Sequence, residues 1–91
     1  MHVVEVIHLR LSSGYEIDPV SLIHNFMNGS GSVSFHLYRH ATLESDFTIH
    51  VHHESSALEI PQTGKALASF LKDFGLVNYS LWTKCEKPDS A

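Results

Sequence analysis

The chain has 91 residues, of which 43% are hydrophobic and 18% are charged. A chain of this length holds one globular core, and its apolar content excludes an intrinsically disordered protein. The net charge of −4 disfavours binding to a nucleic-acid backbone. No apolar run reaches the roughly 18 residues of a membrane span, because Glu5, His8 and Arg10 interrupt the first one.

The beginning of the chain and its cysteine content predict a cytoplasmic protein. Residues 1–5 lack the basic segment and the unbroken apolar stretch of a secretion signal. Cys85 is the single cysteine, so the chain has no internal disulfide and fits a reducing compartment. We therefore expect a cytoplasmic location, with neither nucleic acid nor a membrane among the partners.

The first part of the chain predicts a strand followed by a helix. Residues 3–11 form a short run rich in β-branched side chains, which is typical of a strand. Asp18 and Pro19 provide an N-cap and a proline at the first helical position, and Gly29 stands where that helix should end. The apolar face of this helix would consist of Val20, Ile23 and Met27.

The rest of the chain predicts two strands, a second helix and a last strand. Residues 33–40 and 46–52 alternate between apolar and polar side chains, and a segment of hairpin-loop length separates them. The second helix follows Pro61, and residues 76–83 form the last strand. The apolar face of the second helix would consist of Leu67, Phe70, Leu71 and Phe74.

The order strand, helix, strand, strand, helix, strand predicts an α+β fold of the ferredoxin-like, split βαβ type. We expect a four-stranded antiparallel sheet with the strand order 4-1-3-2 and both helices on one face. Residues 1–85 would form this single domain, and residues 86–91 a polar C-terminal tail.

The alternation of side chains along a strand assigns each residue to one of two sheet faces. The helix-covered face would include Phe35, Leu37, Phe47, Ile49, Tyr79 and Leu81. Glu5 would then lie near the core layer. The opposite face, called the open face from here on, would carry His8, His36, His40, His50 and His52 with Tyr38, Asn78 and Trp82. A face this aromatic is typical of a binding surface.

Other proteins with this layout carry motifs that are absent here. Residues 46–52 lack the basic glycine–aromatic motif of an RNA-recognition domain. Ser12 and Ser13 stand where a copper chaperone has its two cysteines. Residues 11–15 also lack the arginine-bearing anion loop of an acylphosphatase.

The layout of about residues 2–85 and the polar, aromatic open face resemble the dimeric α/β-barrel group, which includes antibiotic-biosynthesis monooxygenase-like proteins. The resemblance implies two chains packed sheet on sheet, with a pocket at each open face. It also implies a polycyclic substrate held by Asn, Trp, Tyr and His side chains, without a cofactor. The counterparts by residue type and face are Asn78, Trp82, Tyr38 and His36.

The first hypothesis is therefore a homodimer that binds a small molecule at the open face and needs no cofactor. It leaves open whether the protein is a monooxygenase-like enzyme or only a binding protein. In an enzyme, His36 or His50 would transfer the proton. The pocket would be lined by His8, Tyr38, His52, Asn78 and Trp82.

Two alternatives stay open. His50 and His52 lie about 6.6 Å apart along one strand face, and His8 or His36 from a neighbouring strand could complete a zinc or nickel site. Asp46 could add a carboxylate to that site. In the other alternative, the open face docks a different protein chain and has no catalytic role.

The remaining histidines receive no site role from the sequence. His53 should point away from the open face at the end of its strand, His24 should lie on a helix surface, and His2 should belong to a frayed terminus. The histidines of the open face should depress one another's pKa below about 6.5, because like charges at short range disfavour ionisation.

Overall fold

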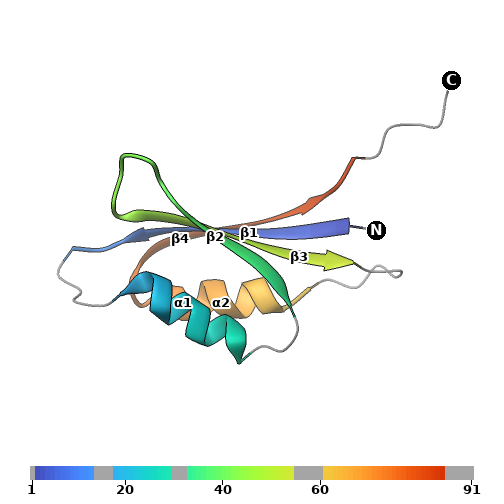
Figure 1. Ribbon diagram of the computed structural model, residues 1–91, viewed down its shortest axis with the longest axis horizontal. Helices are drawn as coiled ribbons and strands as arrows, with labels where there is room; N and C mark the ends of the chain where they lie inside the picture. Colours follow the sequence, from blue (N-terminus) through green and yellow to red (C-terminus); the bar gives the residue numbers. More distant parts are fainter. Residues whose placement is uncertain (1, 14–17, 30–32, 55–60, 86–91) are drawn as a thin grey trace, which may run out of the picture.

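In the computed structural model, which describes residues 2–13, 18–29, 33–54 and 61–85, the chain forms the predicted elements in the predicted order. They are β1 (His2–Leu11), α1 (Pro19–Asn28), β2 (Ser34–Arg39), β3 (Asp46–Glu54), α2 (Thr63–Leu71) and β4 (Gly75–Thr83). Figure 1 shows the strands as one sheet, with both helices against the same face. The predicted α+β ferredoxin-like fold is confirmed.

The sheet has the strand order β2-β3-β1-β4, and each neighbouring pair is antiparallel. β1 is paired on both sides, so that Ile7 lies opposite Ile49 of β3 and opposite Tyr79 of β4. β2 and β4 are therefore the two edges of the sheet. Both crossovers pass over the same side, and no other element of the described chain covers the opposite side (Figure 1).

The described chain contains no helix with the length and apolar character that a membrane crossing requires. The predicted polar tail, residues 86–91, lies outside the described residues.

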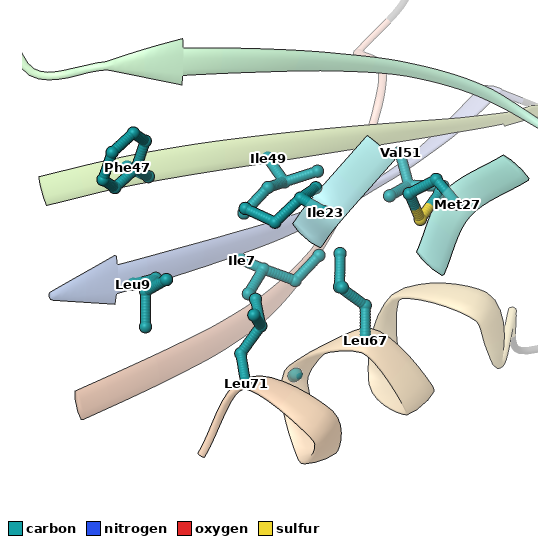
Figure 2. Packing of buried hydrophobic residues seen from close by; sticks show 10 residues of the cluster. Ile7, Leu9, Ile23, Met27, Phe47, Ile49, Val51, Leu67 and Leu71 are labelled. Atoms are coloured by element: carbon teal, nitrogen blue, oxygen red, sulfur yellow. The ribbon is translucent and has the colours of Figure 1, made fainter. Parts of the chain in front are cut away.

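The core lies between the sheet and the two helices, as Figure 2 shows. Its fully buried apolar side chains are Ile7, Leu9, Ile23, Met27, Phe47, Ile49, Val51, Leu67 and Leu71. Phe35, which we expected in this core, is only half-buried and contacts His24 of α1. Phe70 is also half-buried, at the rim of the core, where it stacks on Phe26.

Leu81 lies on the helix-covered side of the sheet, as predicted, because it pairs with Glu5. Its side chain is 42% exposed. The exposure follows from its position: Leu81 lies on an edge strand, opposite Glu5, at the end of the sheet where α2 begins.

The two helices begin in different ways. At α1, Asp18 accepts hydrogen bonds from Val20 N at 3.1 Å and from the Ser21 hydroxyl at 2.8 Å, which confirms the predicted N-cap. At α2, Gln62 occupies the N-cap position but provides no side-chain cap. The first amides of α2 are bound instead by Glu5, a residue of β1.

Candidate functional site

The strand register brings all the predicted site residues onto the open face. One row across the sheet holds Ser34, His52, Val4 and Trp82. The next row holds His36, His50, Val6 and Ser80, and the third holds Tyr38, Thr48, His8 and Asn78. The face that the sequence predicted is thus present as a continuous surface over four strands.

His52 is the centre of an imidazole cluster at one end of this face. Its Nδ1 shares a hydrogen bond of 3.0 Å with Nε2 of His2, and its ring lies 5.3 Å from the ring of His36. The expectation of a frayed His2 is wrong: His2 is the first residue of β1, and its Nδ1 bonds Glu54 at 2.7 Å. Alternation along β1 gives His2 the same parity as His8, which is the signal the sequence offered.

The pKa of His52 is lowered, as predicted, but the crowding of imidazoles is not the largest cause. Partial burial is the largest cause, because it disfavours the charged ring. The positive charges that His2, His36, His50 and His53 carry when protonated act in the same direction. At neutral pH the ring of His52 therefore favours its uncharged form.

The two large exposed aromatic side chains of the open face stand at opposite edges of the sheet. Tyr38, on β2, packs with its ring 5.1 Å from that of His50. Trp82, on β4, donates from its indole Nε1 to the Ser80 hydroxyl at 2.7 Å. Three strand spacings, about 14 Å, separate these edges. Tyr38 and Trp82 therefore flank a floor of β1 and β3 side chains and do not touch one another.

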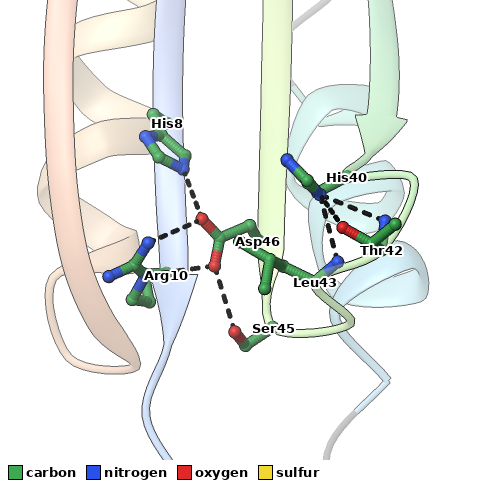
Figure 3. Close-up of polar contacts among 7 residues, drawn as sticks. All are labelled: His8, Arg10, His40, Thr42, Leu43, Ser45 and Asp46. Carbon is green, nitrogen blue, oxygen red and sulfur yellow. Dashed lines mark hydrogen bonds and ion pairs between the residues drawn. The ribbon is translucent and has the colours of Figure 1, made fainter.

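At the other end of the face, Asp46 of β3 is bonded to two side chains of β1 and to its neighbour Ser45, as Figure 3 shows. Its carboxylate accepts from Arg10 Nε at 3.1 Å and from a terminal Arg10 nitrogen at 3.2 Å. His8 Nε2 and the Ser45 hydroxyl complete the set at 3.1 and 3.0 Å. The bonds from Arg10 are the main reason that the pKa of Asp46 falls to about 2.

His40 was assigned to the open face but serves the adjoining loop instead. Its Nδ1 accepts hydrogen bonds from the backbone N–H groups of Thr42 and Leu43 at 3.1 and 3.0 Å (Figure 3). This imidazole therefore orders the β2–β3 connection.

A small pocket opens beside the Asp46 cluster. It has a volume of about 160 Å³ and is lined by His8, Arg10, Leu76 and Asn78. Arg10 gives Asp46 only part of its five N–H donors, so others remain for a ligand. Leu76, which is 72% exposed, adds an apolar wall. The pocket can therefore bind a small group that is partly apolar and accepts hydrogen bonds.

The predicted metal ligands do not converge in this structure. His8 bonds Asp46, His50 lies against Tyr38, and His52 bonds His2. Asp46, the predicted extra carboxylate, is bonded to Arg10. Across the described ranges, no three His, Cys, Asp or Glu side chains form a group able to hold a metal ion. The zinc or nickel alternative stays a prediction.

Sequence reasoning missed a second polar cluster, on the helix-covered side of the sheet. Glu5 is fully buried there. Its Oε1 accepts from Gly64 N at 2.9 Å and from His53 Nε2 at 2.6 Å. Its Oε2 accepts from Lys65 N at 3.1 Å and from the Tyr79 hydroxyl at 2.7 Å. The sequence offered two signals for this cluster. Glu5 occupies a core position of an alternating strand, and the helix after Pro61 has no capping side chain of its own.

This arrangement makes Glu5 the N-terminal cap of α2, although it comes from a distant strand. The carboxylate binds the first amides of the helix, where the helix dipole favours a negative charge. Burial is the first cause that raises the pKa of Tyr79, and the neighbouring Glu5 is the second. His53 points away from the open face, as predicted, but its ring is a partner of this carboxylate.

Comparison of the chain with known protein families, with curated proteins and with solved structures gives no match. The fold and the surface define its class: an α+β ferredoxin-like domain with an aromatic, histidine-bearing open face. Membership of the dimeric α/β-barrel group, which the layout and that face suggested, stays a prediction.

The Glu5 cap predicts an unusual sign for a helix substitution. Gly64→Ala should lower the free energy of unfolding by about 1–3 kcal/mol, because the new Cβ would lie 2.5 Å from Glu5 Oε2. The same change inside a helix normally stabilises by up to about 1 kcal/mol. Glu5→Gln should cost about 2–3 kcal/mol, because the amide cannot accept all the bonds of the carboxylate.

Urea unfolding followed by far-ultraviolet circular dichroism would measure both changes. Glu44→Gln, in the exposed β2–β3 loop, is the matched control and should change the stability by less than about 0.5 kcal/mol. The double variant Glu5→Gln/Gly64→Ala should cost less than the sum of the two single variants, because they disturb one contact. A stabilising Gly64→Ala would contradict the cap.

The lowered pKa of His52 predicts a loss of stability in mild acid. A histidine whose folded pKa lies below its unfolded value of about 6.5 contributes its full stability above that value. The contribution is lost as the pH falls from about 6.5 towards the folded pKa, with a slope of up to about 1.4 kcal/mol per pH unit. His52→Gln should therefore flatten the pH dependence of the free energy of unfolding between about pH 6.5 and 5.

A series of urea midpoints from pH 7.5 to 5 would test this. His24→Gln, which removes an imidazole from the exposed side of α1, should keep the slope of the parent. Parallel profiles for the parent and His52→Gln would show that His52 contributes nothing to the acid response.

Proposed function

We propose that two copies of this chain pack open face to open face, and that the space between them binds a small molecule. The observation that carries the proposal is the number of large side chains left exposed on this face. Leu76 is 72%, Trp82 is 60% and Tyr38 is 52% exposed. Val4 and Val6 lie half-buried between them. A monomer would leave this aromatic and aliphatic surface in water.

Charge on the open face favours a second copy of the same surface. At one end Arg10 and Asp46 neutralise one another, and at the other end the positive charge of Lys84 acts on the carboxylate of Glu54. The rows between them hold aromatic, aliphatic and neutral polar side chains when the imidazoles are uncharged. Although the whole chain carries −4, two such faces meet without net repulsion.

The area of the face is sufficient for a specific, small interface. Four strands at about 4.8 Å and nine residues at about 3.3 Å give roughly 19 by 30 Å, or about 570 Å² per chain. Two flat faces of this size would bury about 1,100 Å², and projecting side chains add to that area. The total is close to the lower limit of about 1,200 Å² for stable complexes.

The pocket supplies the chemistry of the ligand. Its 160 Å³ is below the roughly 300 Å³ at which ligand sites begin, so a second copy must close it. Arg10 would bind an anionic group, while Leu76 and apolar side chains of the second copy would hold a flat apolar body. We therefore propose a small aromatic carboxylate as the ligand class. His8 is the imidazole that lines the pocket and would carry a proton in a reaction there, whereas His36 and His50 lie on β2 and β3, outside its lining.

The dimer is tested by truncating one large side chain on each side of β4, in separate variants. The parent should sediment at twice the chain mass of 10.2 kDa. Trp82→Ala should weaken association by about 2 kcal/mol, or roughly 30-fold in Kd. Leu81→Ala, its neighbour on the other side of the sheet, should leave the dimer intact. A monomeric parent at high micromolar concentration would overturn the proposal.

The ligand class is tested with 1-naphthoate, a flat aromatic carboxylate, titrated into ¹⁵N-labelled protein. The amide signals of His8, Leu76 and Asn78 should shift in the parent. Arg10→Gln should lose these shifts, whereas Arg39→Gln, on the helix-covered side over Phe47, should keep them. Equal shifts in both variants would exclude Arg10 as the anion-binding group, and the same spectra report whether each variant is folded.

A further inference from the structure

The outer edge of β4 is long and unprotected. β4 pairs only with β1 among the described elements and ends the sheet on that side. Its nine residues, Gly75–Thr83, include no proline and no charged side chain. Natural edge strands are usually blunted by lysine, proline or a bulge, because an open edge accepts another strand.

The backbone of this edge is set for strand addition. Lys84 N donates to His2 O at 3.0 Å, and Ser12 N donates to Phe74 O at 2.9 Å. Even-numbered residues of β4 therefore form the hydrogen-bonded pairs with β1, and the ladder alternates. Between these bonds, the N–H and C=O groups of Val77, Tyr79 and Leu81 point outward. No strand of the described chain takes them.

A basic groove runs beside the same edge. It has a volume of about 350 Å³ and lies between α2 and β4. Its lining consists of Lys65, Ala68, Ser69, Lys72, Val77, Asn78 and Tyr79, so it includes two cations and no acid. This contrasts with the net charge of −4 of the whole chain. The groove therefore attracts negative charge although the net charge of the chain is negative.

We infer that β4 and this groove bind an extended acidic peptide, which adds to the sheet as a fifth strand. Lys65 and Lys72 are seven residues apart, or about 10.5 Å along the helix. Side chains on one face of an extended peptide recur about every 6.6 Å. The flexible lysine side chains can span the difference between this repeat and the spacing of the two lysines along the helix. Acidic residues at alternate positions would meet the two lysines, and apolar residues between them would lie beside Leu76 and Trp82.

Other occupants fit this edge less well. Two copies joined through β4 would bring four lysines together across the junction, which like-charge repulsion opposes. A compact anion would leave the backbone edge unpaired. The Tyr79 hydroxyl holds β4 to the buried Glu5 at 2.7 Å, so the edge is preorganised for a partner strand.

The test uses a blocked eight-residue peptide of alternating glutamate and valine, and the full-length chain labelled with ¹⁵N. The acidic peptide should slow hydrogen exchange at the amides of Val77, Tyr79 and Leu81 at least about tenfold. A peptide of alternating lysine and valine should not. The acidic peptide with N-methyl groups at alternate amides keeps its charge but cannot complete the ladder, and it should also fail.

Variants of the protein separate the backbone from the charge. Leu81→Pro removes one outward N–H without breaking a bond to β1, and it should weaken peptide binding at least about tenfold relative to Leu81→Ala. The double reversal Lys65→Glu/Lys72→Glu should switch the preference to the basic peptide. If Leu81→Pro fails to fold, the N-methylated peptide makes the same comparison on the parent.

Several outcomes would overturn the inference. Binding that survives N-methylation, or a preference that survives the charge reversal, would exclude strand addition at this groove. Amide protection that rises with protein concentration in the absence of peptide would show a second copy on the edge. Complete displacement of the peptide by tripolyphosphate at equal concentration would identify a simple anion site. Absence of binding at millimolar peptide would show that the edge does not bind an acidic peptide.

Discussion

The buried carboxylate of Glu5 is the contact on which the arrangement of the other elements depends. It belongs to the central strand and receives donors from β3, β4 and the first turn of α2. An ionised carboxyl group without partners would be costly in this interior, and four hydrogen bonds offset that cost. The same contact requires glycine at position 64, because any Cβ there would collide with the carboxylate.

This anchoring gives the two sides of the sheet different physical characters. On the helix-covered side, one fully bonded charge sits among apolar side chains, and α2 is held at a fixed height beside β4. The basic groove lies between α2, held in this position, and β4. On the open side no helix of the described ranges covers the strands, so aromatic rings, imidazoles and the Arg10–Asp46 pair remain accessible.

Electrostatics link the two proposed binding surfaces to pH in different ways. The open face is close to neutral while its imidazoles are uncharged, and the depressed pKa of His52 extends that neutral range. Acid would add positive charge to this face and oppose the meeting of two copies. The groove at β4 depends on Lys65 and Lys72, and its lining includes no histidine. Association through one surface should therefore respond to mild acid more than binding at the other.

The sequence by itself determined the elements, their order and the two faces, because periods of 2 and 3.6 residues are local properties and right-handed crossovers leave few topologies. It placed Trp82 and His36 on the open face for that reason. The partners of Glu5 lie 48 to 74 residues away in the chain, so only the tertiary structure could decide them. The same holds for the bonding of Asp46 to Arg10 and for the place of His2 beside His52. Alternation tells which face a side chain occupies, whereas strand register decides which side chain it meets there.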